Sequence, residues 1–262
     1  MNKLLLFFIC IFLFACCIPS RPKDRNASKQ LNSSDNNKIE IPATIQNENI
    51  VTYTGFTLSY NTTYLIPNWV AYELTEDEVV YNPPPFRGSF IPDPNVSYMQ
   101  ADGFDYRGSG WSRGHMAPAA DYKWSKNAYN DTFYYTNCCP QNQEMNNGSW
   151  NVLENYVRKL AKKYGLVYVV TGPVVGNNRY GKIGAHQVVV PDGFFKALLI
   201  DFNGKYYAIG FYMENIPEKQ HLKDCCMSIN ELEIITGIDF FPSLSDDIES
   251  EVESEIQYNI WF

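Results

Sequence analysis

The sequence predicts one α+β domain, in which a sheet is packed against a few helices. Runs of aromatic and β-branched residues, separated by Gly, Asn and Pro, recur from about residue 50 to residue 241, and this is the pattern of β-strands. The stretch 146–164 instead spaces its apolar residues three and four apart, as an amphipathic α-helix does. A length of roughly 200 residues suits a single hydrophobic core.

Strands and helices follow one another along this domain. The proline-rich segment 81–97 between the early strands cannot be regular structure, and it carries Arg87. The helix at 146–164 has Gly165 at its C-cap position, and a second helix at 228–237 begins with the capping box Ser228 to Glu231. Strands are expected at 51–61 with a break at Gly55, at 64–75, from 131 to a stop at Pro140, and at 166–175, 186–191, 193–201 and 205–213.

The first fifteen residues are typical of a secretory signal. Lys3 is the only charge before the apolar run 4–15, which is shorter than the ~20 apolar residues of a membrane span. The run ends in "LFAC" and resembles a bacterial lipoprotein signal with Cys16 as the lipidation site; plain secretion is the alternative, because Phe14 is bulky for that pattern. We expect residues 1–15 to be a signal peptide and the protein to be exported, to the bacterial periplasm or cell surface, with a lipid anchor in the membrane.

Two polar segments flank the predicted domain, which we place at 50–242. Asn, Ser, Lys, Asp and Pro dominate residues 16–49, and such a composition cannot repay the entropy of folding, so we expect a disordered tether. The acidic stretch "DDIESEVESE" dominates residues 243–262, which we expect to be a solvated tail.

The net charge of −8 argues against a high-affinity nucleic-acid binder, because such a protein normally carries a basic face. An enzyme that contacts a few phosphates and releases its product is still compatible with this charge.

The mature cysteines form two adjacent pairs, Cys138–Cys139 and Cys225–Cys226. An exported protein can form disulfides, so we expect one pair to bridge to the other. Reduced, buried thiols are the alternative. A zinc site is disfavoured, because neighbouring cysteines compete for one tetrahedral ion.

The segment "SRGHMAPAAD" (112–121) places His115, one of three histidines, directly after an Arg-Gly pair. A lone His is most often a structural residue, but here polar side chains follow it among apolar neighbours. Glu154 and Arg158 lie four apart and can share one face of the helix, where an ordinary surface ion pair is the simpler interpretation. His186 and His221 are expected to be structural, and Lys196 in "FFKALL" to be a cross-strand partner. The polar side chains that follow His115 are Asn137, Gln141, Asn146, Glu154 and Arg158.

This segment and "FYYTNCCPQNQEMNNGSWNVLENYVRKL" closely resemble the DNA/RNA non-specific endonuclease family, also called His-Me finger or ββα-metal nucleases. The family signature is Asp-Arg-Gly-His, followed by an Asn, a Trp and a Leu-Glu pair. The resemblance extends over about residues 50 to 242 and implies a ββα-metal fold with a mainly antiparallel central sheet flanked by helices. The matching residues are Arg113, Gly114, His115, Asn146, Trp150, Leu153 and Glu154.

The resemblance also implies a role for each residue. His115 matches the general base that activates water, and Asn146 matches the protein ligand of a divalent metal ion, usually Mg²⁺, with Mn²⁺ as an alternative. Glu154 matches a carboxylate that orients metal-bound water. DNA and RNA would be the substrates, cut to leave 5′ phosphates. Arg87 and Arg158 match arginines that contact phosphate, while Arg113, Asn137 and Gln141 match residues near the metal or the substrate.

Ser112 departs from the family pattern, which has Asp at this position. If the Asp is only structural, a serine can replace its hydrogen bonds. If it tunes the metal or the histidine, activity falls. Two alternatives to an active endonuclease therefore stand: a nuclease-fold surface lipoprotein that has lost turnover and acts as a binding module, and a phosphodiesterase for small substrates.

Overall fold

The computed structural model describes residues 38–44, 48–81 and 86–262. The predicted signal peptide at 1–15, the predicted lipidation site Cys16 and most of the predicted tether lie outside these residues. Among the helices that are described, none is long and apolar enough to cross a membrane.

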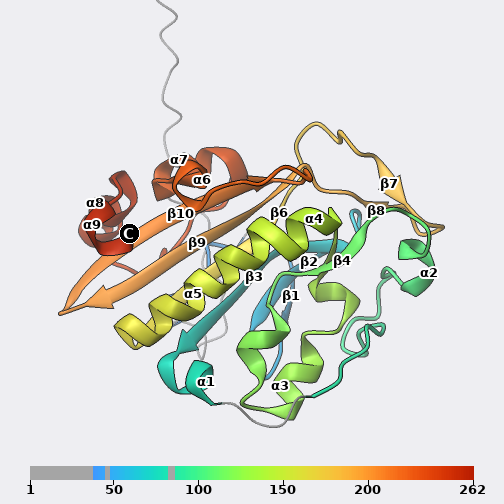
Figure 1. Cartoon of the computed structure of the whole chain (residues 1–262), viewed down its shortest axis with the longest axis horizontal. Coiled ribbons are helices and arrows are strands. Elements are labelled where there is room, and N and C mark those ends of the chain that lie inside the picture. Colours follow the sequence, from blue (N-terminus) through green and yellow to red (C-terminus); the bar gives the residue numbers. More distant parts are fainter. Residues whose placement is uncertain (1–37, 45–47, 82–85) are drawn as a thin grey trace, which may run out of the picture. The chain divides into compact units, whose positions relative to one another are not determined.

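A seven-stranded antiparallel sheet forms the centre of the fold (Figure 1). Its order is β1-β2-β3-β6-β9-β10-β11, and every neighbouring pair is antiparallel. The predicted α+β class with a mainly antiparallel sheet is therefore confirmed. The strands are β1 (Asn49–Thr52), β2 (Thr57–Asn61), β3 (Ile66–Thr75), β6 (Leu166–Val174), β9 (Gly193–Phe202), β10 (Lys205–Glu214) and β11 (Cys226–Met227).

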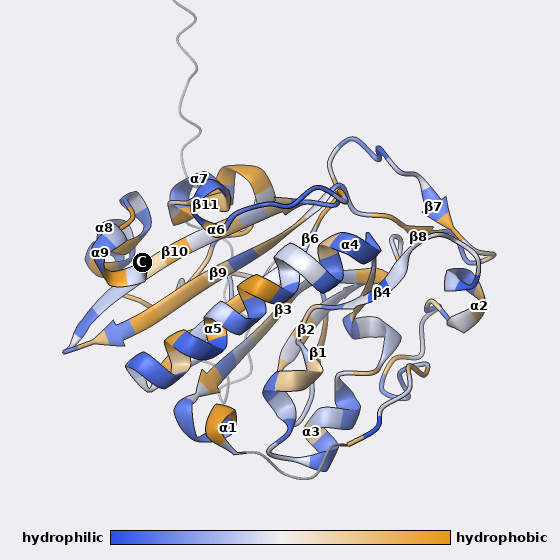
Figure 2. Ribbon diagram, viewed as in Figure 1, coloured by the Kyte–Doolittle hydropathy of each residue, from blue (hydrophilic) through white to orange (hydrophobic). Residues whose placement is uncertain are grey.

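Both faces of the sheet are buried, because successive residues of its central strands enter two different hydrophobic clusters. On β9, Phe194 and Leu198 pack on one face, and Phe195 and Leu199 pack on the other. This explains why the central strands are hydrophobic without alternation (Figure 2).

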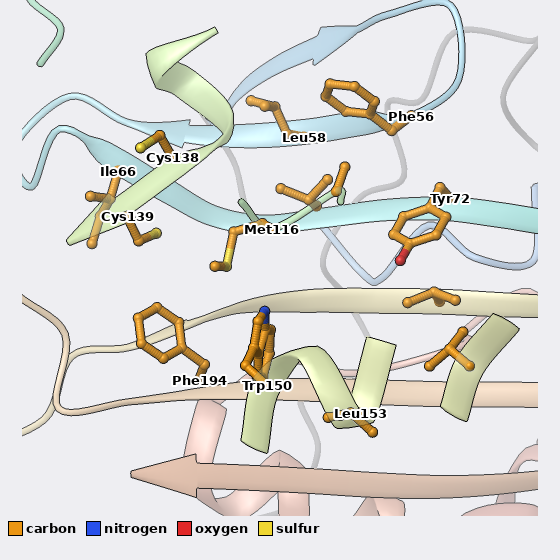
Figure 3. Packing of buried hydrophobic residues seen from close by; sticks show 14 of the residues in the cluster. Phe56, Leu58, Ile66, Tyr72, Met116, Cys138, Cys139, Trp150, Leu153 and Phe194 are labelled. Atoms are coloured by element: carbon orange, nitrogen blue, oxygen red, sulfur yellow. The ribbon is translucent and has the colours of Figure 1, made fainter. Parts of the chain in front are cut away.

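Helix α5 (Asn151–Tyr164) lies across β3, β6 and β9 on the first face (Figure 1). Its apolar residues Leu153, Val157 and Leu160 are buried against the sheet, and it ends at Gly165 with φ 85°. Figure 3 shows Trp150 and Leu153 packing toward residues of the same layer, such as Phe194 and Met116. The helix predicted at 146–164 is confirmed from Asn151 onward, whereas its first five residues form a π-helical turn, Asn146–Trp150.

The opposite face is covered by α7 (Ile229–Thr236), the segment 238–244 and part of α8 (Asp246–Ser254). Helix α7 starts with the predicted capping box of Ser228 and Glu231. The remaining helices are short: α1 (Glu76–Val80), α2 (Gly103–Tyr106), η1 (Ala119–Tyr122), α3 (Lys126–Asp131), η2 (Tyr135–Asn137), α4 (Gln143–Met145), η3 (Asn146–Trp150), α6 (Leu222–Cys225) and α9 (Tyr258–Trp261).

Two small antiparallel pairs lie outside the main sheet: β4 (Ser112–His115) with β5 (Cys138–Gln141), and β7 (Lys182–Ile183) with β8 (Val188–Val189). The strand expected to start at 131 begins only at Cys138, after the 3₁₀ turn η2, and it contains Pro140 instead of stopping there. Pro140 is tolerated because β5 pairs with β4 alone within the described residues, so it needs no donor on its other side.

The ends of the domain are more structured than their composition suggests. Ile41, in the segment expected to be a tether, is buried on the second face. At the other end, the residues expected to form a solvated tail instead form α8 and α9, and Val252 and Trp261 are buried. Asp246, Asp247, Glu251 and Glu255 are exposed, whereas Glu253 is buried next to Val252, so composition alone hides the amphipathic pattern.

The expected bridge between the cysteine pairs is wrong: all four cysteines are free. β5 contacts β3, whereas Cys226 lies in β11, which is separated from β3 by three strands. At about 4.8 Å per strand this separation far exceeds the Cα distance of a disulfide. Cys138 and Cys139 are fully buried in the core, and burial raises the pKa of both thiols.

Candidate active site

Strands β4 and β5 and helix α5 form a ββα unit around His115. The two strands are antiparallel, and Ser112 lies opposite Gln141 while His115 lies opposite Cys138. Chain continuity then carries the strand pair into α4, the π-helical turn η3 and α5. Asn146 is the first residue of η3, so the unit holds the His and the Asn of the signature on neighbouring elements.

Gly114 is needed where the two strands meet. A Cβ atom at this position would lie 2.1 Å from Oε1 of Gln141, whose side chain is fully buried. Glycine therefore allows Gln141 to pack over the strand directly before His115. The glycine of the Arg-Gly-His pattern is therefore required for packing, independently of the chemistry of the histidine.

Two phenylalanines enclose the imidazole of His115. Its ring lies 4.7 Å from the ring of Phe90 and 4.9 Å from that of Phe133, between ring centroids. The Nε2 atom is buried and has no hydrogen-bond partner among the residues that the structure describes. Burial lowers the pKa of His115 to about 4, so the ring is neutral at pH 7 and Nε2 or Nδ1 can accept a proton.

Asn137 fixes the turn that follows His115. It is fully buried, and its Oδ1 accepts from the backbone N–H of Ala117 at 2.9 Å. Its Nδ2 donates to the carbonyl groups of Ala117 and Thr132. Because these backbone groups occupy both ends of the fully buried amide, Asn137 supports the histidine strand.

Ser112 connects the strand to the metal-ligand candidate. Its Oγ donates to the carbonyl oxygen of Gln141 at 2.8 Å and accepts from Nδ2 of Asn146 at 3.2 Å. The Oδ1 of Asn146 takes no hydrogen bond from the described residues, so it is free to bind a cation. A serine thus fits at the position of the family's Asp.

Arg87 lies on an exposed segment that packs beside His115. Phe86 and Phe90 flank it, and the carbonyl of Phe86 accepts from the hydroxyl of Tyr129 at 3.2 Å. Arg113 is also exposed, with its guanidinium 5.4 Å from the ring of Phe90. Both arginines are therefore open to solvent: Arg113 lies on the strand of His115, and Arg87 lies three residues before Phe90, whose ring contacts the imidazole.

The sequence resemblance implies that Arg158 contacts phosphate, but in the structure its side chain forms an internal ion pair. Its Nη1 donates to Oδ1 of Asp121 at 2.6 Å, and the side chain is only 16% exposed. Asp121 is fully buried and also accepts from the hydroxyl of Tyr72. Arg158 is thus committed to an internal ion pair, and a role in phosphate contact would have to come from its remaining donors.

Glu154 belongs to a buried ionic cluster under α5, which we define as Asp121, Glu154, Arg158 and Lys196. Burial raises the pKa of Glu154, and the charges of Lys196 and Arg158 oppose this shift. Lys196 is fully buried, donates to Oγ1 of Thr171 at 3.2 Å and lies 4.7 Å from the ring of Trp150. The cluster therefore holds a carboxylate next to the helix face that also carries the signature Trp.

Sequence reasoning missed several residues of this site. Phe90 and Phe133 gave no signal, because aromatic residues are common throughout the chain. Asp121 lies in the quoted segment "SRGHMAPAAD" but has no spacing that marks it. Lys196 was predicted as a cross-strand partner, and this is confirmed by its pairing with Thr171. The burial of Lys196 could have been predicted, because it lies within the otherwise apolar run "FFKALL".

The other two histidines, which the sequence predicts to be structural, lie outside the ββα unit. Nδ1 of His186 is 2.9 Å from Oδ2 of Asp105, and its backbone N–H donates to the same carboxylate. His221 is exposed at the start of α6.

The model of the DNA/RNA non-specific endonuclease family matches residues 32–247. With the antiparallel sheet and the ββα unit, this match defines the class of protein: the chain belongs to the DNA/RNA non-specific endonuclease family, as its sequence signature predicted.

Individual relatives agree with this assignment. The chain is 39% identical over 210 residues to "Nuclease EXOG, mitochondrial" of Xenopus laevis, covering 74% of this chain and 59% of that protein. It is 30% identical over 218 residues to a protein named "Nuclease" of Nostoc sp., covering 77% and 76%. The chain thus spans about three fifths of the length of the mitochondrial relatives that it matches first.

A solved structure shares the fold. The crystal structure of an EndoG/EndoGI complex superposes with a TM-score of 0.75 at 26% identity, covering 84% of this chain and 96% of the other.

Proposed function

We propose that this protein is a metal-dependent endonuclease that hydrolyses phosphodiester bonds in both DNA and RNA and leaves 5′ phosphates. The observation that carries the proposal is the ββα unit, in which an enclosed neutral imidazole lies on the same short strand as the serine that binds Asn146. Membership of the endonuclease family supports the same reaction. Contacts to phosphate instead of bases would explain a lack of sequence specificity.

The residues present fit a hard divalent cation such as Mg²⁺, with Mn²⁺ as the alternative. Asn146 offers a free amide oxygen, and Mg²⁺ accepts few protein ligands because it retains most of its water. Glu154 supplies a carboxylate for orienting water near such an ion. When bound, the ion would stabilise the negative charge that develops on the phosphate and on the leaving oxygen.

The chain's own residues perform the remaining steps. His115 accepts the proton of the attacking water, since a neutral imidazole is its stable form at pH 7. Phe90 and Phe133 hold the ring in place and limit its hydration. Arg87 and Arg113 are exposed, and their guanidinium groups can position the phosphate.

Single-turnover cleavage of a DNA and an RNA substrate by matched variants tests this proposal. His115→Ala should lose roughly 100-fold or more in rate, since general-base catalysis contributes roughly 10²–10⁴-fold. Asn146→Ala should also cleave much more slowly, because it removes the proposed ligand of the divalent ion. His221→Ala and Asn259→Ala, which alter exposed residues of the same types, should cleave as the unaltered protein does. Normal rates for the two site variants would contradict the proposed roles.

We further propose that the protein is exported and anchored through Cys16. The short apolar run and the "LFAC" ending support this. Some of the relatives are instead named as mitochondrial, so this part of the proposal rests on residues 1–16 of this chain alone. Labelling with a palmitate analogue should mark the protein but not its Cys16→Ala variant; equal labelling of both would refute the anchor.

A further inference from the structure

The hydroxyl of Ser112 lies between two polar groups of the site. Its Oγ is 2.8 Å from the backbone oxygen of Gln141 and 3.2 Å from the amide Nδ2 of Asn146. Strand pairing fixes the first contact, because Ser112 and Gln141 are opposite each other in the β4–β5 ladder. The second contact joins this ladder to η3.

The positions of the hydrogens follow from the chemistry of the three groups. A carbonyl oxygen can only accept, so the one hydrogen of the Ser112 hydroxyl must point at Gln141. The hydroxyl oxygen then presents only lone pairs to Asn146. Of the two ends of a carboxamide, only the NH₂ group can fill that position, since an oxygen there would face another oxygen.

We propose that Ser112 is a positioning residue that fixes the side-chain amide of Asn146 in one orientation and thereby presents Oδ1 to the divalent ion. This inference rests on the proposed function, in which Asn146 binds the metal. It explains why the departure from the family's Asp is compatible with activity. It also gives the serine a role that an aspartate cannot fill in the same way, because a carboxylate at 2.8 Å from the Gln141 carbonyl would place two acceptors in contact.

Without the hydroxyl, the Asn146 amide loses the partner that distinguishes its two ends. An amide that rotates freely turns its NH₂ group instead of Oδ1 toward the ion for part of the time, and a cation does not bind to an NH₂ donor. Outer partners of metal ligands are typically worth 10- to 100-fold in metal affinity. We therefore expect loss of the hydroxyl to weaken metal binding by roughly tenfold or more.

The matched pair Ser112→Thr and Ser112→Val tests this directly. Both side chains are β-branched and suit a strand, and they differ only in a hydroxyl against a methyl group. Binding of Mn²⁺ alone is measured by electron paramagnetic resonance on the full-length protein, and the Mg²⁺ concentration for half-maximal cleavage is measured in parallel. Ser109→Ala, three residues upstream, is the control, because its hydroxyl bonds to Tyr106 instead of Asn146.

The expected result is that Ser112→Thr keeps wild-type Mn²⁺ affinity, whereas Ser112→Val loses about tenfold or more and needs correspondingly more Mg²⁺. Equal affinities for the two variants, with Asn146→Ala still impaired, would overturn the role of Ser112 and leave the proposed function intact. If Asn146→Ala binds Mn²⁺ as tightly as the unaltered protein, the metal site itself is wrong. These outcomes separate the two proposals.

Discussion

The neutrality of His115 is a property of its immediate surroundings. The ring carries no ion-pair partner in the described residues, and burial between Phe90 and Phe133 disfavours the charged form. His186 has the opposite environment, because the carboxylate of Asp105 hydrogen-bonds to it and raises its pKa. The two histidines should therefore titrate on opposite sides of the ordinary value of about 6.5.

An NMR titration of the imidazole signals in the metal-free protein should resolve this difference. We expect His115 to remain neutral down to about pH 4 and His186 to be protonated above its ordinary pKa. For His115 the unfolded chain takes up its proton first, so its contribution to stability falls as the pH drops from about 6.5 toward 4. For His186 the stabilising ion pair is present at low pH and is lost as the pH rises through the raised pKa. Titration of His115 at or above 6.5 would contradict the enclosed-ring interpretation.

The sequence named candidate site residues but not the surroundings that set their properties. His115, Asn146 and Glu154 were found because the signature spaces them. The partners that set their properties come from distant parts of the chain, and no local spacing marks them. Phe90, Asp121 and Lys196 are of this kind, since each meets the site only through tertiary packing.

The β4–β5 pair is the element on which the site depends, and it requires close approach of Gly114 to Gln141. Gly114→Ala should destabilise the protein by about 1–3 kcal/mol, because overpacking a buried position forces side chains and strands apart. Cleavage should fall with it, since the displaced strand carries Ser112 and His115.

Gly148→Ala is the matched control for this prediction. A Cβ at Gly148 meets nothing within 4 Å, and replacing a helical Gly by Ala stabilises by up to about 1 kcal/mol. Urea denaturation of both variants measures the difference. Equal stabilities would show that β4 and β5 tolerate a larger separation than the structure indicates.

Helix α5 is joined to η1 by the ion pair of Arg158 and Asp121. Removing the guanidinium leaves a carboxylate that is only 1% exposed without its cation, so Arg158→Met should destabilise by about 3–5 kcal/mol. The double variant Asp121→Asn/Arg158→Met should recover most of this loss, because it leaves no buried charge unpaired. Chemical denaturation of the two single variants and the double variant measures the coupling.

The same cycle decides between two roles for Arg158. The sequence resemblance implies phosphate contact, whereas the structure shows an internal ion pair. If Arg158→Met keeps full stability but loses cleavage through a raised KM, the arginine acts on substrate and the structural interpretation fails.

Among the elements, the amphipathic helix α5 and the capped helix α7 were predictable, because their signals are periodic and local. The strand boundaries around 131–141 were not predictable from such signals. The run "FYYTN" has strong β-propensity, yet Tyr135–Asn137 form a 3₁₀ turn. The buried amide of Asn137 bonds to backbone groups of Thr132 and of Ala117, which lies in a distant segment, so tertiary contacts override the local preference.

At the scale of the whole molecule, the C-terminal segment is part of the fold. Trp261 is 2% exposed, and its carbonyl accepts from the hydroxyl of Tyr156 on α5. Trp261→Ala should lower stability by about 3–5 kcal/mol, as large-to-small changes of buried aromatic residues do. Tyr258→Ala on the same short helix is the control, because that side chain is 55% exposed.

A thermal melt of the two variants distinguishes a packed end from a solvated one. If Trp261→Ala melts with the unaltered protein, the acidic tail expected from composition is the better description. The sequence concealed this packing because acidic residues outnumber the apolar ones that anchor the helices.

The central claim is that this chain is a metal-dependent endonuclease without sugar specificity. The most direct measurement is the digestion of supercoiled plasmid and of RNA by the purified, full-length protein, with Mg²⁺ and with a chelator. We expect both substrates to be cut with Mg²⁺ and both to survive with the chelator. A folded protein that leaves both intact with Mg²⁺ and with Mn²⁺ would contradict it and would favour a binding module built on the nuclease fold.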